Sequence, residues 1–525
     1  MSAIPLPTFI EALLDPSRYP DDVECVQLLE THISWVLLAG QYAYKIKKPV
    51  DFGFLNFSRL ALRQFYCQEE IRLNRRLAPR IYLDVVGIGG TPEQPCFGRE
   101  PAFEYAVKMQ RFTVSQTLDN LCARRQLQAA HIDALAEGIA QFHLGLAGSA
   151  PDSDHGRAAK VWLPVAENFH HLQDLLPAED HAVLCALRQT CEAEFADCRE
   201  TLEQRRLDGM IRECHGDLHL GNIVLLEDRP VPFDGIEFNA DLRWIDVISD
   251  VAFLVMDLLY RQRADLAYRF LDVYLQITGD YAGLKVLRFY LAYRATVRAK
   301  VSALRCAQGG EGIAQDCRDY LALAGRVLAA PTPALIITHG LPGCGKTTVS
   351  QSVLETFAAI RLRSDVERKR LFGLQALQRP DPSDDELYTP RASERTYAYL
   401  LDWAAQILNS GFPVIVDAAF LSRDERRQFQ ALAQALAIPF VILHIEAEER
   451  LIRQRLQQRQ SGGRDASDAD EHVYQLLKAW DEPLTADERV CAIEYWNDID
   501  SAQPRTYRTL WLHLASMTGL KPIDR

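Results

Sequence analysis

Two well-separated stretches of the sequence combine residue types that handle phosphate groups. Residues 215–222 read His-Gly-Asp-Leu-His-Leu-Gly-Asn and are followed by Asp234, whereas residues 340–347 read Gly-Leu-Pro-Gly-Cys-Gly-Lys-Thr. Carboxylate and amide oxygens can ligate magnesium or accept a proton, and glycine-rich backbone with lysine and threonine can surround phosphates. The two stretches therefore predict two nucleotide-dependent phosphotransfer sites in one chain.

The later stretch fits the pattern G-x-x-x-x-G-K-[ST] at every constrained position, between an apolar strand expected at 334–338 and a helix expected from 347. Its glycines allow a tight turn, so that backbone N–H groups and the helix start face the phosphates. Lys346 is expected to reach the β- and γ-phosphates, and Thr347, in preference to Thr348, to ligate magnesium. The predicted nucleotide-binding residues here are Gly340, Pro342, Gly343, Cys344, Gly345, Lys346, Thr347 and Thr348.

Cys344 allows two interpretations. The amide-rich surroundings could lower the pKa of its thiol and make it sensitive to oxidation. The simpler interpretation is a small residue that fits the loop.

Acidic and basic side chains follow the later strands. Asp417 ends an apolar run at 413–417, where a magnesium-orienting carboxylate belongs. Asp365 and Arg368, in the stretch Arg-Leu-Arg-Ser-Asp-Val-Glu-Arg, are the candidate base and the candidate clamp on the transferring phosphoryl group. A helix N-cap followed by a solvated charged face is the alternative for these two residues.

Residues 334 to about 515 resemble a P-loop kinase of the AAA-type group that includes polynucleotide kinase, gluconate kinase and zeta-toxin-type enzymes. In small P-loop kinases a mobile lid supplies arginines to the phosphates. The resemblance implies such a role for Arg455, in the arginine-rich stretch 450–459 that precedes a low-complexity segment at 461–470. A solvated helix face is the alternative for each of these arginines.

The earlier stretch has the spacing of a kinase catalytic loop, with an aspartate and an asparagine five residues later. A hairpin expected from residue 222 then leads to Asp234. The sequence of residues 215–222, followed by Asp234, resembles the aminoglycoside phosphotransferase and choline-kinase-like family. This resemblance implies that Asp217 is the catalytic base, that Asn222 and Asp234 are metal ligands, that His215 supports the loop and that Glu237 is a supporting acid.

A kinase-like fold also needs a phosphate-binding lysine and a helix glutamate to hold it. A hairpin expected at 33–47 places Lys45 and Lys47 on one face of its second strand. Lys45 matches the Ala-x-Lys order and is preferred over Lys47, and Glu70 is the candidate partner on the following helix. Solvated lysines on an edge strand are the alternative, and no Gly-x-Gly-x-x-Gly loop accompanies the hairpin.

The length of 525 residues exceeds what one core supports. We expect an α+β bilobal protein-kinase-like domain at 1–328, with an N-lobe at about 1–112 and a C-lobe at about 113–328. A linker at 329–333 would lead to an α/β P-loop domain with a mainly parallel sheet at 334–525. Asp246 and Asp250 are expected to brace the catalytic loop by hydrogen bonding.

Composition limits the partners. The net charge of −13 argues against a broad nucleic-acid-binding surface, although a nucleic-acid end remains an acceptor candidate beside small molecules and nucleotides. The twelve cysteines lack metal-binding spacing, and no signal peptide or membrane span is recognisable, so a cytoplasmic location is expected. The expected cofactors are ATP, with GTP as the alternative, and Mg²⁺.

Three functions agree with these patterns. The first is a bifunctional kinase that phosphorylates a hydroxyl group at each site. The second is a single kinase in which the other nucleotide-binding domain is regulatory or inactive. The third is a P-loop ATPase with water as the only acceptor, for which the sequence offers no water-positioning residue.

Overall fold

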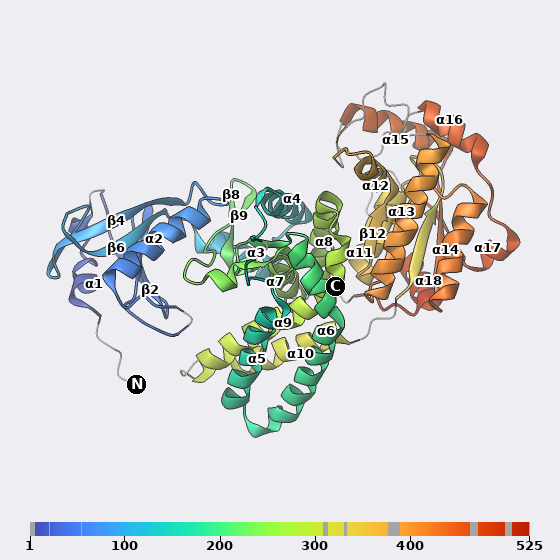
Figure 1. Cartoon of the computed structure of the whole chain (residues 1–525). Helices are drawn as coiled ribbons and strands as arrows, with labels where there is room; N and C mark the ends of the chain where they lie inside the picture. Colours follow the sequence, from blue (N-terminus) through green and yellow to red (C-terminus); the bar gives the residue numbers. More distant parts are fainter. Residues whose placement is uncertain are drawn as a thin grey trace. The chain divides into compact units, whose positions relative to one another are not determined.

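The computed structural model describes residues 6–523 except 20–21, 54, 151, 308–312, 330–332, 376–377, 379–388, 463–470 and 499–506. Its contacts divide the chain into two compact units (Figure 1). The first comprises Met1–Leu135, Gly145–Trp162 and Leu202–Leu254, and the second comprises the rest. Most of the predicted linker, and residues 463–470 of the low-complexity segment, fall outside the described residues, so the domain boundary stays a prediction.

The first unit contains a six-stranded antiparallel sheet in the order β1-β2-β3-β6-β4-β5. Alternation along β3 places Tyr44 and Ile46 in the apolar core beneath α1, and Ala43 in the core that faces α2. Lys45 and Lys47 therefore lie on the α2 side. The bounds are α1 Thr8–Ala12, β1 Val26–Glu30, β2 Ser34–Ala39, β3 Tyr42–Lys47, α2 Leu60–Asn74, β4 Tyr82–Thr91, β5 Gln94–Phe97 and β6 Ala102–Gln110.

Two short antiparallel strand pairs are associated with the stretch 215–234. Strand β7 precedes the stretch and pairs with β10, which follows it, and the hairpin of β8 and β9 lies within the stretch. Glu227 and Asp228 join β8 to β9 with positive φ angles of 50° and 59°, as in a two-residue hairpin turn. The bounds are β7 Ile211–Glu213, β8 Ile223–Leu226, β9 Arg229–Pro232 and β10 Trp244–Asp246.

Helices make up most of the chain between β6 and the second sheet. Their bounds are α3 Leu118–Ala123, α4 Ala129–Gly145, α5 Ala158–Leu175, α6 His181–Leu207, α7 Val247–Tyr260, α8 Ala264–Thr278, α9 Leu284–Ala307 and α10 Ile313–Leu328. The long helices α9 and α10 pack against each other within the second unit. No helix in the described part of the chain is both long and apolar enough to cross a membrane.

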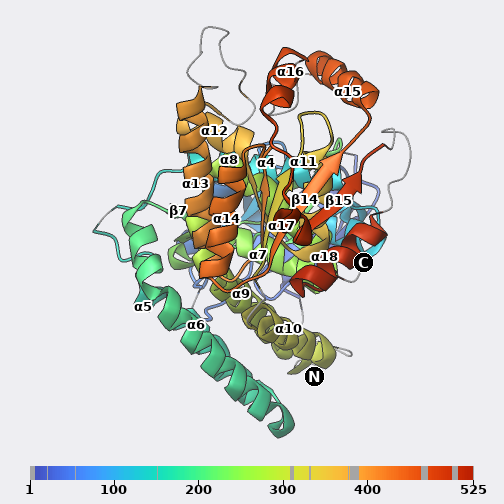
Figure 2. The same cartoon turned by 90° about the vertical axis from the view of Figure 1, so that its right-hand side faces the viewer.

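The second unit also contains a five-stranded sheet in the order β12-β13-β11-β14-β15, in which every pairing is parallel. Helices α11 and α18 share one core with strands β11, β13 and β14, whereas α13 and α14 contact the sheet separately (Figure 2). The strands are β11 Leu335–His339, β12 Ile360–Arg363, β13 Val414–Asp417, β14 Phe440–Glu446 and β15 Ala492–Trp496. The helices are α11 Lys346–Phe357, α12 Ser364–Leu371, α13 Pro390–Asn409, α14 Arg423–Ala435, α15 Glu449–Gly462, α16 Glu471–Trp480, α17 Ala486–Val490 and α18 Arg508–Thr518.

The predicted fold class is confirmed. An antiparallel sheet with a packed helix and a following helical region corresponds to the kinase-like domain, and the parallel sheet with flanking helices corresponds to the P-loop domain. The carboxyl ends of β11, β12 and β13 lead directly into the stretches that carry the predicted second site.

Candidate functional sites

The first site begins with the two lysines of β3. Lys45 Nζ lies 2.9 Å from Glu70 Oε1 and 2.6 Å from Asp234 Oδ1. Lys47 Nζ lies 2.6 Å from Glu70 Oε2 and also pairs with Glu237. Glu70, from α2, thus holds both lysines, one with each carboxylate oxygen. The two lysines differ in access, because the Lys45 side chain is 13% exposed and that of Lys47 is 1% exposed.

The charges of this cluster are balanced by their contacts. Burial disfavours the ammonium form of Lys45, but the carboxylates of Asp234 and Glu70 outweigh it and raise the pKa of Lys45 well above its ordinary value. Burial also opposes ionisation of Glu70, yet the two lysines lower the pKa of Glu70 below its usual range. Lys45 and Glu70 are therefore both charged at neutral pH. Lysines on a solvated edge strand, the alternative weighed from the sequence, do not describe it.

Asp217 and Asn222 are joined directly in the loop that follows β7. Asn222 Nδ2 donates to the Asp217 backbone oxygen at 3.1 Å and to Asp217 Oδ2 at 2.9 Å. This orientation of the amide directs its donors to Asp217 and leaves Asn222 Oδ1 as an acceptor suited to a cation. The Asp217 side chain is 36% exposed, so its carboxylate is accessible from solvent.

His219 is a residue of this loop that the sequence analysis did not single out. Its Nδ1 accepts a hydrogen bond from Gly221 N at 3.1 Å, so Nε2 carries the proton of the neutral ring. Nε2 lies 3.5 Å from Asp217 Oδ2. Its position, two residues after Asp217 in the sequence, is the signal that could have identified it.

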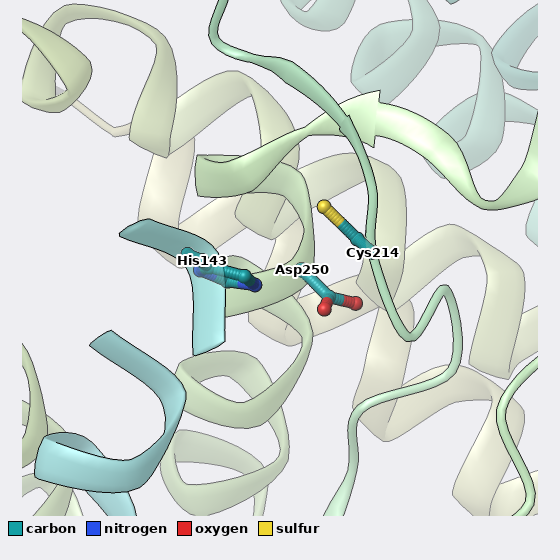
Figure 3. A group of neighbouring side chains, drawn as sticks. All are labelled: His143, Cys214 and Asp250. Carbon is teal, nitrogen blue, oxygen red and sulfur yellow. The ribbon is translucent and has the colours of Figure 1, made fainter. Parts of the chain in front are cut away.

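Asp250 of α7 braces the loop 215–222 by hydrogen bonding, as predicted. Its two carboxylate oxygens accept hydrogen bonds from His215 N at 3.0 Å and from Gly216 N at 2.9 Å. Figure 3 shows Asp250 beside Cys214, whose thiol pKa is raised by burial. Asp246 has different partners: it accepts bonds at 2.7 and 2.8 Å from Arg205 of α6. The bracing role therefore falls on Asp250.

Asp234 has a left-handed backbone, with φ of 62°, which is uncommon for a residue other than glycine. The conformation is fixed from both sides, because Asp234 N donates to Tyr82 Oη at 3.0 Å and Gly235 N donates to Asn74 Oδ1 at 2.7 Å. The Asp234 side chain is 45% exposed. These two hydrogen bonds therefore hold an accessible carboxylate beside Lys45 in spite of the strained backbone.

The donor chemistry of the first site fits magnesium. Asp217, Asn222 and Asp234 offer carboxylate and amide oxygens, which are the ligands that this hard cation prefers. The residues predicted for this site form two bonded groups: ion pairs join Lys45 to Glu70 and Asp234, and hydrogen bonds join Asn222 to Asp217. Their roles stay predictions.

The second site is built on the turn from β11 to α11. Gly340, Gly343 and Gly345 have φ angles of 143°, 83° and 100°, a region that side chains rarely adopt. A Cβ atom on Gly345 would lie 2.0 Å from Asn497 Nδ2, and one on Gly340 would lie 2.3 Å from the Ile445 backbone oxygen. Only glycine fits these positions, and the resulting bare backbone at a helix start suits phosphate groups.

Lys346 and Arg455 both contact the loop backbone. Lys346 Nζ donates to the carbonyl oxygens of Gly340 and Leu341 at 2.8 and 2.9 Å. Arg455 of α15 donates from Nη1 to the Gly343 oxygen at 3.3 Å and from Nη2 to the Asn497 oxygen at 2.8 Å. Asn497, which the sequence analysis missed, is fully buried and donates to the Cys344 oxygen at 2.8 Å.

The oxidation-sensitive interpretation of Cys344 is corrected. The residue is 1% exposed, and burial raises the pKa of its thiol despite the nearby Lys346. A thiol of this kind is a small apolar residue of the loop.

Asp417 lies at the end of β13, as predicted, and is 5% exposed. The hydroxyl of Ser350 on α11 lies 3.2 Å from Asp417 Oδ2 and 3.0 Å from the Thr347 backbone oxygen. Arg363 Nε lies 3.8 Å from the same Asp417 oxygen. The carboxylate is therefore positioned from both α11 and β12.

Asp365 and Arg368 lie on α12, which follows β12. Asp365 is in the first turn, but the N-cap position is Arg363, so Asp365 is not the cap. Burial raises the pKa of both Tyr397 and Glu425, and the positive charge of Arg368, whose side chain lies near them, acts in the opposite direction. Burial raises the pKa of Glu425 to about 7. Glu425, in the first turn of α14, is a further titratable group that the sequence did not reveal.

Two family models match parts of the chain. Residues 105–289 match the phosphotransferase enzyme family, and residues 335–484 match an AAA domain. An uncharacterised protein of Mycobacterium tuberculosis is 32% identical over 452 residues, which cover 85% of this chain and 89% of that protein.

Two solved structures are similar to part of the chain. A choline/ethanolamine kinase family protein from Mesorhizobium loti has 13% identity and a TM-score of 0.38, with coverage of 62% of this chain and 96% of that chain. A gluconokinase from Sinorhizobium meliloti has 18% identity and a TM-score of 0.24, with coverage of 33% and 86%, respectively.

Proposed function

We propose that this chain is a bifunctional ATP-dependent phosphotransferase. The chain belongs to the same family as the uncharacterised Mycobacterium tuberculosis protein. It joins a phosphotransferase-family domain to a P-loop kinase-like domain. Each domain transfers the γ-phosphoryl group of ATP to a hydroxyl group. The acceptors are small molecules or the ends of nucleotides or nucleic acids.

The observation that carries the proposal is the convergence at the first site. Lys45 pairs with Glu70 and Asp234, and Asn222 bonds to Asp217, although these residues come from four separate stretches of the chain. A purely structural ion-pair cluster would not need the exposed carboxylates of Asp217 and Asp234. Their exposure supports a site that receives two substrates.

At this site Asp217 accepts the proton of the acceptor hydroxyl, while the oxygen of that hydroxyl bonds to the γ-phosphorus of ATP. The bond from that phosphorus to the bridging oxygen breaks, and ADP leaves with the electron pair. Asn222 and His219 orient the Asp217 carboxylate through Oδ2, and Lys45 binds phosphate oxygens. Asn222 and Asp234 would hold magnesium, which would neutralise charge on the phosphates.

At the second site the glycine-rich turn and Lys346 bind the phosphates of the nucleotide. Thr347 and Asp417 would hold magnesium there. Asp365 accepts the proton of the acceptor hydroxyl, and Arg368 and Arg455 stabilise charge on the phosphoryl group. The support for this assignment is that Asp365 follows β12 and Asp417 ends β13, and these two strands are paired in parallel.

The test is transfer from γ-labelled ATP, with magnesium, to a panel of sugars, nucleosides, 5′-hydroxyl oligonucleotides and aminoglycosides, with water as the control acceptor. Asp365→Asn separates a hydroxyl kinase from an ATPase at the second site. Loss of labelled acceptor in this variant, with nucleotide binding retained, supports the kinase. Label found only in inorganic phosphate, at the same rate in Asp365→Asn, would replace it with the P-loop ATPase.

A further inference from the structure

Helix α8 precedes the predicted domain boundary, yet it belongs to the same compact unit as the parallel sheet and packs against α11 and β12 (Figure 1). Tyr268, Asp272 and Gln276 recur every four residues and therefore share one face of α8. Tyr268 packs against the core formed by α11, α18 and the sheet. This face of α8 is thus part of the core of the P-loop region.

Asp272 forms a buried ion pair with Arg361 of β12. Arg361 donates from Nε to Asp272 Oδ1 at 3.2 Å and from Nη2 to Oδ2 at 2.6 Å. The two side chains are 2% and 4% exposed, and Gln276 Nε2 donates to Asp272 Oδ2 at 2.7 Å. A two-pronged pair of this kind fixes the plane of the guanidinium group.

The same guanidinium reaches the start of α11. Arg361 Nη1 donates to the Thr347 backbone oxygen at 3.1 Å and to Ser350 Oγ at 3.2 Å. The Ser350 hydroxyl lies next to Asp417 Oδ2, as described above. One arginine therefore connects Asp272 to the segments that carry Thr347 and Asp417, the two proposed magnesium ligands of the second site.

A second set of contacts joins the end of α8 to α12. Tyr281 Oη, just after α8, donates to Glu367 Oε1 at 2.8 Å, and Glu367 is fully buried. Arg370 pairs with Glu367 and bonds to the Gln276 backbone oxygen. Because Asp365 lies on the same short helix as Glu367, these contacts also orient the proposed base of the second site.

We propose that α8 is a working part of the second phosphotransfer site, and that Asp272 is a positioning residue that acts through Arg361 on Thr347, Ser350 and Asp417. The proposal rests on the proposed function in that it deepens the account of the same site. The Asp272 carboxylate touches neither nucleotide nor acceptor. It fixes the arginine that sets the first turn of α11 against the end of β13.

The test compares full-length variants for magnesium-dependent binding of a fluorescent ATP analogue. The second-site signal is defined as the part of the binding that is lost in Lys346→Ala. Asp272→Asn keeps the shape of the side chain and removes its charge. Arg269→Gln is the matched control, because Arg269 lies on the same helix and pairs with Glu355 of α11 at 2.8 Å, at the end of α11 remote from Lys346.

Asp272→Asn is expected to raise the magnesium concentration for half-maximal binding at the second site by about 10-fold to 100-fold, as supporting residues of metal sites do. Arg269→Gln is expected to leave this concentration unchanged. Equal magnesium dependence in folded Asp272→Asn and in the parent chain would overturn the proposal.

The single variant leaves Arg361 buried without its partner, and it can fail to fold for that reason alone. Asp272→Asn/Arg361→Gln removes both charges and separates the two effects. Recovered thermal stability with a half-maximal magnesium concentration that stays raised supports the positioning role. Recovery of both stability and the parent magnesium concentration would overturn it. Binding does not require phosphoryl transfer, so these results stand apart from the outcome of the acceptor panel.

Discussion

Lys45 Nζ lies 2.6 Å from Asp234 Oδ1, although the two residues are 189 positions apart in the chain. The same ammonium group lies 2.9 Å from Glu70 Oε1. Lys45 therefore connects β3, α2 and the segment after β9, the three parts that a kinase-like site must hold together. This arrangement assigns different tasks to the two lysines of β3.

Lys45→Met is expected to lower kcat/KM for ATP at the first site by roughly 10²-fold to 10³-fold, the usual effect of removing one donor aimed at developing charge. Steady-state kinetics with the acceptor of the first site measure this. Lys48→Met is the control, because the neighbouring Lys48 pairs with the exposed Glu30 instead. Equal activity of Lys45→Met and Lys48→Met would contradict the phosphate-binding role.

Lys47→Met is expected to act on stability. The substitution leaves Glu70 and Glu237 buried beside each other with one cation fewer, which costs about 3–5 kcal/mol when one partner of a buried pair is removed. Urea unfolding measures the change. Adding Glu237→Gln to Lys47→Met removes the carboxylate that has lost its lysine, and should restore part of the lost stability. No recovery of stability in the double variant would contradict the charge-balance account.

Gly345→Ala is expected to weaken nucleotide binding at the second site by at least about tenfold, because a side chain at a φ of 100° is strained and its Cβ would collide with Asn497. Gly325→Ala in α10 is the control, since a Cβ there meets no atom within 4 Å. Calorimetric titration with ATP distinguishes the two. Unchanged affinity in Gly345→Ala would show that the turn does not bind the phosphates.

The raised pKa of Glu425 predicts that the free energy of unfolding depends on pH. Burial raises its pKa to about 7, so the folded chain binds the proton more tightly than the unfolded chain. This contribution is fully present below the ordinary carboxylate pKa and is lost as the pH rises through about 7. Glu425→Gln cannot lose a proton, so its stability relative to the parent should rise by roughly 2 kcal/mol between pH 5 and pH 8.

Chemical unfolding at a series of pH values measures the effect of Glu425→Gln. Asp424→Asn, at the adjacent exposed position, is the control and should show no such trend. A stability difference between Glu425→Gln and the parent that stays constant with pH would mean that Glu425 titrates as an ordinary surface carboxylate.

The sequence predicted much of the fold because local patterns carry it. Apolar runs at 334–338 and 413–417 correspond to β11 and β13, since a parallel strand buried on both faces must be apolar throughout. The glycine-rich turn was recognisable because its backbone angles exclude other residues. Strand alternation placed Lys45 and Lys47 on one face but could not separate their roles, because both reach Glu70.

The remaining features depend on contacts between distant segments. Asp272 and Arg361 are 89 positions apart and lie in different predicted domains, and either residue alone resembles a surface charge. Asn497 is a single amide near the end of the chain, and its role follows only from its bond to Cys344. No local pattern marks such residues, since tertiary packing alone brings their partners to them.

The most direct test of two active phosphotransfer sites is transfer of label from γ-labelled ATP in Asp217→Asn, Lys346→Ala and the double variant. The account predicts that each single variant loses transfer to one class of acceptor and keeps the other, and that the double variant loses both. Loss of every transfer in one single variant, with no effect of the other, would contradict it and leave a single kinase with one regulatory nucleotide-binding domain.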